Sequence, residues 1–277
     1  RVFQLKSAPA LPSRLGIDYT ATLNDEQRAV VLAPRGPLLV LAGAGSGKTR
    51  ALTYRVARFI DEGIAPERIL LLTFTNRAAR AMLDRVAALV GAQSQRVMGG
   101  TFHHVANAIL RSHAEAIGYA PNFTILDRED ARDMMDAAVA DARINVTKER
   151  FPKADVLLDL ASLAINTQVP ARELVLRRAP RFLYLADQLM QVCQAFIKRK
   201  VDRNLMDFDD LLMNWKLLLE EGGPLSDSIR GRFEAVLVDE YQDTNALQGQ
   251  IIDLMGKGHN NITAVGDDAQ CIYGFRG

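Results

Sequence analysis

The glycine-rich segment Ala42–Thr49 constrains the fold of this chain more than any other stretch. It reads Ala-Gly-Ala-Gly-Ser-Gly-Lys-Thr and directly follows the apolar run Leu38–Leu41. An apolar strand, a glycine turn ending in Gly-Lys-Thr and a helix together form the pattern of a phosphate-binding loop. Glycines keep side chains away, so backbone N–H groups can wrap phosphates at the positive end of the helix. We therefore expect a buried strand, a phosphate-binding loop and a helix, in that order.

The end of this segment predicts the nucleotide and the metal. Lys48 is expected to reach the β- and γ-phosphates of a nucleoside triphosphate, and the Thr49 hydroxyl to hold Mg²⁺. The strict pattern has glycine where this chain has Ala42, and we expect this small side chain to be tolerated. The expected nucleotide-binding residues of the segment are Ala44, Gly45, Ser46, Gly47, Lys48, Thr49 and Arg50.

The composition mainly excludes some classes of protein and of site. The 277 residues are 48% apolar and 24% charged, which is ordinary for a globular protein of one large or two smaller domains. No apolar run is long enough to span a membrane, and the net charge of +1 means that nucleic-acid binding would need local basic patches. Cys193 and Cys271 are far apart, which favours the reducing cytoplasm and neither a disulfide nor a zinc site.

The order of apolar runs predicts an α/β fold. Residues 1–21 lack periodicity and are interpreted as a tail, and residues 22–113 contain strand–helix repeats that imply a parallel sheet flanked by helices. Residues 114–204 are nearly all helical in pattern, which indicates an inserted all-helical subdomain. Two more apolar runs, at 235–238 and 262–265, return the chain to the sheet over residues 205–277.

Acidic residues after a later strand complete the predicted chemistry. Asp239 and Glu240 follow the apolar run 235–238, and ligands of parallel sheets bind at the carboxyl ends of strands. We expect Asp239 to share the metal with Thr49 and Glu240 to orient or deprotonate the attacking water. Gln270, just beyond the next strand, is expected to sense the γ-phosphate.

Aromatic residues near these strand ends are candidates for stacking on nucleic-acid bases. Phe74 follows the strand 69–73, although a packing role is also open. Tyr273, Phe275 and Arg276 follow Gln270 within a few residues and offer two rings and a cation. Basic clusters in the helical segment, at 177–181 and 198–200, are either phosphate contacts or solvated helix faces.

These motifs, in their order and spacing, resemble the UvrD/Rep/PcrA group of superfamily 1 DNA helicases. The similar segments are Leu23–Arg28, Ala42–Thr49, Thr73–Ala79, Gly100–His103, Phe208–Leu212, Val238–Asp243 and Val265–Gly277. Where that group often has tryptophan, this chain has Phe275, which can still stack with less surface.

The resemblance implies several roles that the residues alone leave open. Gln27, which could simply cap a helix with Asn24, would recognise adenine, and Thr75, Asn76 and His103 would join Phe74 in contacting DNA. The fold would be a RecA-like P-loop NTPase domain with a helical insertion. The group moves 3′ to 5′ along single-stranded DNA at duplex junctions. It uses a second, C-terminal RecA-like domain of the same chain, which we expect to be missing here.

Two other functions are compatible with parts of this sequence. A DNA-binding module without motor activity would need an inactive ATP site, which the intact Lys48, Asp239 and Glu240 disfavour. A P-loop kinase would need a lid over its substrate, and it usually lacks a glutamate after the aspartate.

Overall fold

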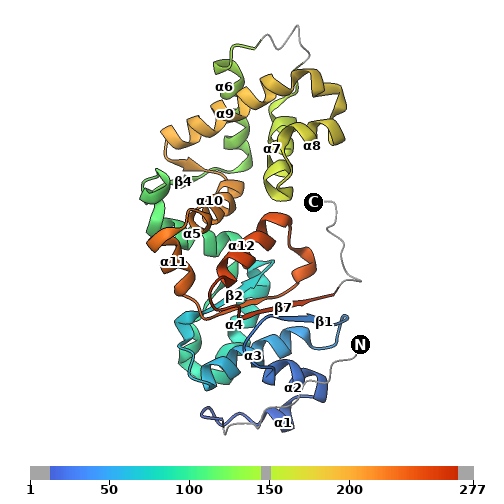
Figure 1. Cartoon of the computed structure of the whole chain (residues 1–277), viewed down its shortest axis with the longest axis vertical. Coiled ribbons are helices and arrows are strands. Elements are labelled where there is room, and N and C mark those ends of the chain that lie inside the picture. The colour runs from blue at the N-terminus through green and yellow to red at the C-terminus, as the bar shows by residue number, and fades with distance from the viewer. Residues whose placement is uncertain (1–12, 145–150, 268–277) are drawn as a thin grey trace. The chain divides into compact units, whose positions relative to one another are not determined.

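The computed structural model describes residues 13–144 and 151–267 of the chain (Figure 1). Within them the chain forms two compact units. The sheet unit contains residues 13–105, 219–244 and 251–267, and the helical unit contains residues 106–144, 151–218 and 245–250. Among the described residues, no helix is long and apolar enough to cross a membrane.

The sheet unit is built on a fully parallel sheet, as the strand–helix repeats predict. Its described strands lie in the order β1-β7-β6-β2-β3, and every neighbouring pair is parallel. Their bounds are β1 Leu38–Leu41, β2 Ile69–Thr73, β3 Met98–Thr101, β6 Ala235–Val238 and β7 Ile262–Gly266. The α/β fold class is therefore confirmed.

One feature of the first strand differs from the expectation. β1 lies at an edge of the described sheet, so it is not the buried strand that its apolar sequence predicts. Leu39 and Leu41 are 57% and 64% exposed. Hydrophobicity alone cannot distinguish an edge strand from a central one, because the difference depends on which segments pair with it.

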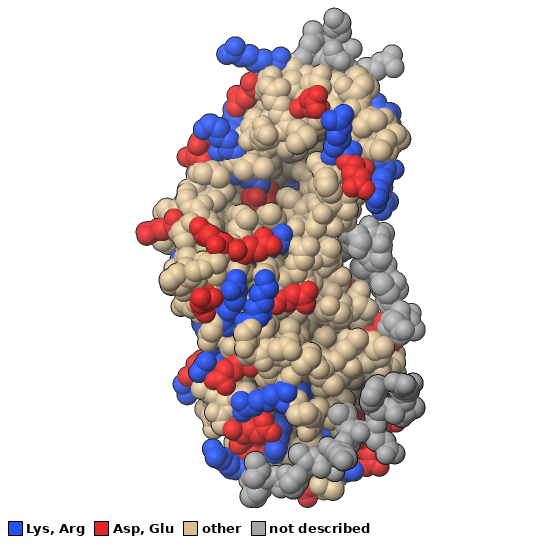
Figure 2. All heavy atoms as spheres, viewed as in Figure 1, with Lys and Arg blue, Asp and Glu red and all other residues tan. Residues whose placement is uncertain are grey.

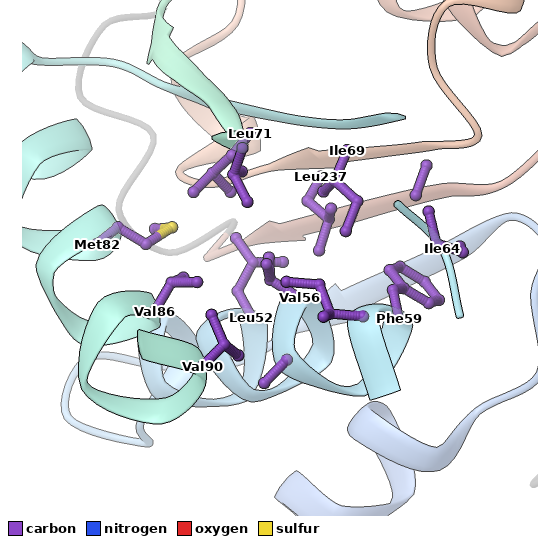
Figure 3. Packing of buried hydrophobic residues seen from close by; sticks show 14 of the residues in the cluster. Leu52, Val56, Phe59, Ile64, Ile69, Leu71, Met82, Val86, Val90 and Leu237 are labelled. Carbon is purple, nitrogen blue, oxygen red and sulfur yellow. The ribbon is translucent and has the colours of Figure 1, made fainter. Parts of the chain in front are cut away.

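Helices that follow the strands cover the sheet and form its main core. α3 (Lys48–Asp61) and α4 (Asn76–Val90) contact each other and pack on β7 and β2. Figure 3 shows Leu52, Val56 and Phe59 of α3 meeting side chains of α4 and of the strands. The apolar residues of both helices recur at helical spacing, so each helix buries one continuous face.

The N-terminal helices dock onto this layer. α1 (Tyr19–Thr22) and α2 (Asp25–Leu32) precede β1, and Asn24 caps α2 by accepting a hydrogen bond from the Gln27 backbone N–H at 2.8 Å. Tyr19 is buried and its hydroxyl donates to Asp61 at 3.3 Å. Leu15 and Ile17 also pack against the core of the sheet unit, so the tail expected over 1–21 does not include them.

A buried arginine joins α2 to the core. Arg55 of α3 is fully buried and donates to the carbonyl oxygens of Val30, Val31, Ala33 and Pro34 and to the Thr263 hydroxyl. Burial lowers its pKa to about 10, so the guanidinium stays charged at neutral pH. The C-terminal end of α2 is thereby held to α3 and β7 by one side chain.

The helical unit has its own apolar core. It contains α6 (Arg128–Asp141), α7 (Ala154–Thr167), α8 (Ala171–Arg178), η4 (Pro180–Leu185) and α9 (Ala186–Asp202), whose buried residues form one cluster. α5 (Phe102–His113) leads into this unit and α10 (Phe208–Glu220) leads out of it. α11 (Gly223–Gly231), η5 (Tyr241–Asp243) and α12 (Ala246–Gly256) complete the helices that flank β6 and β7 in the chain.

A small parallel ladder and a buried ion cluster extend the helical unit beyond the expected 114–204. β4 (Thr124–Ile125) pairs with β5 (Leu205–Met206), where the sequence suggested no strand. Lys200, 2% exposed, lies 2.6 Å from carboxylates of both Asp207 and Asp210. These contacts tie the start of α10 to α9.

The basic clusters at 177–181 and 198–200 are largely paired with acidic residues. Lys200 is buried, so it is unavailable to DNA phosphates. Its neighbours Lys198 and Arg199 pair with Asp202 and Asp141, and Arg177 pairs with Glu173. On the face shown in Figure 2, basic and acidic side chains are interspersed. These arginines and lysines are mostly members of ion pairs rather than parts of a basic patch.

Candidate functional site

Three strand ends meet at the carboxyl edge of the sheet unit. β1 and β7 end in register, with Leu41 opposite Gly266, and β6 lies on the other side of β7. The glycine-rich segment follows β1, Asp239 and Glu240 follow β6, and Asp267 follows β7. Residues separated by about two hundred positions in sequence are therefore neighbours, because parallel strands all end at the same edge.

The segment between β1 and α3 forms a compact loop. The Ala42 N–H donates to the Gly266 carbonyl at 3.0 Å, and the Ser46 hydroxyl donates to the Gly43 carbonyl at 2.7 Å. Gly45 and Gly47 have φ angles of 76° and 84°, in the left-handed region that favours glycine. The loop then enters α3 at Lys48, so the helix N-terminus faces it.

Gln27 contacts this loop directly. Its side-chain Nε2 donates to the Ser46 carbonyl at 3.1 Å, so the side chain does not complete a capping box with Asn24. A Cβ atom at Gly47 would lie 2.3 Å from Gln27 Nε2. Gly47 therefore gives room to Gln27 as well as adopting a left-handed backbone, and the amide of Gln27 lies beside the loop.

A pocket of about 730 Å³ opens beside the loop. Its lining includes Gly47, Lys48, Thr49 and Glu240, which all belong to the predicted site. Arg50 also lines it, held by hydrogen bonds to the Thr22 carbonyl at 2.9 Å and the Tyr54 hydroxyl at 3.4 Å. The volume lies in the range of pockets for small ligands and cofactors.

The pocket lining also contains residues that the sequence did not suggest. Thr53 and Tyr54 of α3 line it, and so do Arg85, Ala88 and Leu89 of α4. The helical spacing of 85, 88 and 89 places them on one face of α4, but the spacing does not tell which neighbour that face meets.

Asp239 and Thr49 form a pair suited to a divalent cation. The Thr49 side chain lies beside the Asp239 carboxylate and favours its charged form, and Asp239 is 5% exposed. Burial, and then the charge of Glu240, raise the pKa of Asp239 to about 6. Its Oδ1 is buried with no hydrogen-bond partner among the described residues. A carboxylate and a hydroxyl are oxygen ligands of the kind that Mg²⁺ prefers, and a cation there would satisfy this atom.

Other kinds of metal site receive less support. In the described part of the chain, no group of three or more His, Cys, Asp or Glu side chains has a metal-binding arrangement. The adjacent His103 and His104 lie in the first turn of α5 and belong to no such group among these residues. A site built from one carboxylate and one hydroxyl suits Mg²⁺, which keeps several waters and binds substrate phosphates.

Lys48 and Glu240 approach each other across the site. Lys48 Nζ lies 3.8 Å from Glu240 Oε2 and 3.6 Å from Asp267 Oδ2, and its side chain is 8% exposed. Glu240 has a left-handed backbone, with φ 51° and ψ 47°, which is strained for a residue other than glycine. The turn after β6 thus places Asp239 and Glu240 side by side. Asp267 follows a predicted strand, but no role for it was expected from the sequence.

The candidate DNA-contacting residues lie at the other half of this edge. β2 and β3 end in register at Thr73 and Thr101, so the segment after β2 and the start of α5 are neighbours. Phe74 and His103 are half-buried, while Thr75 and Asn76 are exposed. Thr75 also caps α4, because its hydroxyl accepts from the Ala78 N–H at 3.1 Å. The remaining candidates, Gln270, Tyr273, Phe275 and Arg276, lie outside the described residues.

Comparison with known proteins finds a family match over most of the chain. The model of the UvrD/REP helicase N-terminal domain matches residues 23–277. The chain is similar to the ATP-dependent DNA helicase PcrA of Leuconostoc citreum, at 39% identity over 260 residues. It is similar to proteins of the same name from Staphylococcus aureus, at 36%, and Staphylococcus epidermidis, at 37%, each over 257 residues.

These alignments cover most of this chain but only about a third of each relative. The match with the Leuconostoc protein includes 93% of this chain and 34% of that protein. The match with the Staphylococcus aureus protein includes 92% of this chain and again 34% of the relative. The chain thus spans about a third of the length of the curated relatives that it matches.

Proposed function

This chain belongs to the UvrD/REP helicase N-terminal domain family, and from that premise we propose that it is the ATP-binding RecA-like domain of an ATP-dependent DNA helicase. The observation that carries the proposal is the shared location of four side chains. Lys48, Thr49, Asp239 and Glu240 come from two strand ends and meet at one edge of the parallel sheet. A non-hydrolytic DNA-binding module would have no need for this combination.

Each of the four side chains has a distinct role in this proposal. Lys48 contacts the β- and γ-phosphates, for which it would leave the carboxylates of Glu240 and Asp267. Thr49 and Asp239 hold Mg²⁺, which when bound neutralises phosphate charge. Glu240 orients the attacking water and accepts its proton.

The other predicted nucleotide contacts surround the loop. The backbone N–H groups of Ala44–Gly47 cradle the phosphates, since left-handed glycines leave that surface free of side chains. Gln27 and Arg50 bind the adenosine part, which is supported by the hydrogen bond of Gln27 to the Ser46 carbonyl and by Arg50 in the pocket lining.

The DNA strand is proposed to bind at the same edge, over the ends of β2 and β3. Phe74, Thr75, Asn76 and His103 would contact it, which is supported by the register of Thr73 with Thr101. Tyr273, Phe275 and Arg276 would stack on bases and pair with phosphates, and Gln270 would sense the γ-phosphate. The proposed substrate is single-stranded DNA at a duplex junction, with translocation from 3′ to 5′.

A second RecA-like domain is proposed to complete the ATP site. The chain spans about a third of its relatives' length, and 34% coverage leaves room for such a domain. An arginine supplied to a phosphoryl-transfer site raises the rate by roughly 10³–10⁵-fold. We therefore expect the 277-residue chain alone to bind ATP but to hydrolyse it very slowly.

ATP turnover by the full-length parent protein, with and without single-stranded DNA, tests the proposal. DNA should stimulate turnover, Lys48→Ala should abolish it, and Glu240→Gln should keep nucleotide binding while losing turnover. Lys257→Ala and Glu221→Gln, at exposed positions, are matched controls that should behave as the parent. Turnover that ignores DNA, or that depends on a small-molecule phosphate acceptor, would contradict a motor.

The isolated chain provides a second test. Equilibrium titration with a fluorescent ATP analogue should detect binding that Lys48→Ala removes. Strong DNA-stimulated turnover by the 277-residue chain would contradict the need for a second domain.

A further inference from the structure

The side chain of Gln242 bridges two strand ends at the candidate site. Its Nε2 donates to Glu240 Oε2 at 2.8 Å, and its Oε1 accepts from the Asp267 backbone N–H at 2.9 Å. Both distances are those of good hydrogen bonds. The neutral amide thus joins the end of β6, which bears Glu240, to the end of β7, from which the chain continues into residues 268–277.

Both partners of Gln242 also approach Lys48. The Glu240 oxygen that Gln242 contacts lies 3.8 Å from Lys48 Nζ, and a carboxylate oxygen of Asp267 lies 3.6 Å from it. A phosphate group would compete with these carboxylates for the ammonium charge. The contact with Gln242 does not depend on that charge, because an amide is neutral, so it can hold Glu240 while Lys48 moves to phosphate.

The backbone around this bridge supports the same interpretation. Glu240 is in the left-handed region, and such a conformation persists only where the surrounding contacts enforce it. The Asp243 N–H donates to the Glu240 carbonyl at 2.9 Å, and the Thr244 hydroxyl donates to the Tyr241 carbonyl at 2.7 Å. These bonds fix the turn, whereas the Gln242 amide is bonded to the carboxylate itself.

The last residue of β7 leaves room for this amide. A Cβ atom on Gly266 would lie 2.9 Å from Gln242 Oε1 and 3.3 Å from the Gln242 backbone nitrogen. Any larger residue at 266 would therefore have to displace the bridge. Gly266 has an ordinary backbone conformation, so the close approach of Gln242, and not the φ angle, is what requires glycine here.

We propose that Gln242 is a positioning residue for water activation, which holds the Glu240 carboxylate in place through its Nε2 and ties it to the Asp267 backbone through its Oε1. The inference rests on the proposed role of Glu240 in ATP hydrolysis. A rigid link between these strand ends would let a displacement at residue 267 move the carboxylate, and a displacement of the carboxylate move residue 267.

Two substitutions at Gln242 in the full-length parent separate the two arms of the bridge. Gln242→Met keeps the length of the side chain and removes both hydrogen bonds. Gln242→Glu keeps an acceptor for the Asp267 N–H but places a second carboxylate against Glu240, which repels it. Both should lower kcat by about 10–100-fold, because a catalytic group misplaced by about 1 Å costs roughly that much. The Kd for an ATP analogue should change by less than about threefold, because the bridge joins Gln242 to Glu240 and the Asp267 backbone and not to the glycine-rich loop.

A double substitution asks whether Gln242 acts through Glu240. In a Glu240→Gln background, Gln242→Met should cause no further loss of turnover, because residues that act as one unit are not additive. Gln191→Met and Gln191→Glu, at an exposed position of α9, are the matched controls and should leave kcat unchanged. Thermal unfolding of each variant checks that it is folded, and Gln242→Glu decides the question if Gln242→Met does not fold.

Three results would overturn the inference. One is a kcat within about threefold of the parent for Gln242→Glu, because the Glu240 arm would then be dispensable. Another is an equal loss of affinity and turnover, which indicates a general distortion of the site. The third is that Gln242→Met lowers turnover in the Glu240→Gln background by the same factor as in the parent. If Glu240→Gln itself keeps normal turnover, the proposed function of Glu240 fails, and that result is distinct from all three.

Discussion

Replacement of Arg55 by methionine should reveal how α2 is held against the sheet unit. The guanidinium donates to four carbonyl oxygens at the C-terminal end of α2 and the following turn, and to the hydroxyl of Thr263 in β7. It also lies 4.8 Å above the ring of Phe59. Methionine fills part of the same volume, so the substitution mainly removes hydrogen bonds and charge.

The expected loss of stability depends on which hydrogen-bond acceptors of Arg55 can bind water once the guanidinium is gone. The contacts to Val30, Ala33 and Pro34 are only partly buried, so those carbonyls can be rehydrated. The Thr263 hydroxyl and the Val31 carbonyl form buried contacts and would lose their partner. A buried unsatisfied polar group costs about 1–3 kcal/mol, so we expect Arg55→Met to lower the free energy of unfolding by about 3–4 kcal/mol. This loss is a large part of the roughly 5–15 kcal/mol that stabilises a typical domain.

The assay combines urea unfolding, followed by circular dichroism, with hydrogen exchange of the α2 amides. Arg55→Lys, which keeps a charge but not the planar array of donors, should show a smaller loss than Arg55→Met. Arg80→Met is the matched control, because Arg80 is exposed on α4 and has no hydrogen bond or ion pair among the described residues. In Arg55→Met, hydrogen exchange of the α2 amides should be faster than in the parent protein, whereas exchange of the strand amides should change less.

The same substitution should weaken nucleotide binding, because α2 positions Gln27 against the Ser46 carbonyl. We expect a lower affinity for an ATP analogue under conditions where Arg55→Met is fully folded. A loss of stability below about 1 kcal/mol, with unchanged exchange in α2, would refute the assignment of Arg55 as the link between α2 and the core.

Three further predictions follow from single contacts. Gly47→Ala places a Cβ 2.3 Å from Gln27 Nε2 in a left-handed backbone, so affinity for an ATP analogue should fall by about tenfold or more, since that conformation costs about 1–2 kcal/mol; an affinity within twofold would contradict this. Lys200→Met leaves two buried carboxylates without their cation and should lower stability by about 3–5 kcal/mol at pH 8, measured by fluorescence of the single tryptophan. Burial and the neighbouring Asp207 carboxylate raise the pKa of Asp210, so Asp210 should become protonated as the pH falls to 5. The stability loss caused by Lys200→Met should then be smaller at pH 5 than at pH 8, and an equal loss at both pH values would contradict this prediction. Burial lowers the pKa of His259 below its ordinary value of 6.5, so this residue should make the protein less stable as the pH falls through 6.5; His259→Gln should remove that part of the pH dependence in urea unfolding.

The local elements of the site were predictable because their signals lie within a few residues. The Asn24 cap of α2, with its bond to the Gln27 N–H, is present as expected. The glycine-rich loop between β1 and α3 depends on Gly45 and Gly47, whose conformations few other residues adopt. In such segments, neighbouring residues determine the backbone, so sequence is sufficient.

Contacts between distant segments were missed or left open, because they depend on which elements pair and not on neighbouring residues. Gln242 and Asp267 are 25 positions apart, and their hydrogen bond exists because β6 and β7 are paired. The burial of Lys200 depends on aspartates that start the next helix, and the exposure of Leu39 depends on β1 lying at an edge. Side-chain type and spacing do not specify which partner a residue meets across the fold.

The sequence by itself therefore determined the parallel α/β class, the glycine-rich loop between β1 and α3, and the acidic pair that follows β6. Tertiary structure alone decided that Gln27 reaches Ser46, that Lys48 meets Asp267, and that Gln242 joins two strand ends. The physical reason is that backbone conformation follows from local sterics and hydrogen bonding. Burial, pKa shifts and bridging hydrogen bonds instead arise when packing brings remote side chains together in a medium with little water.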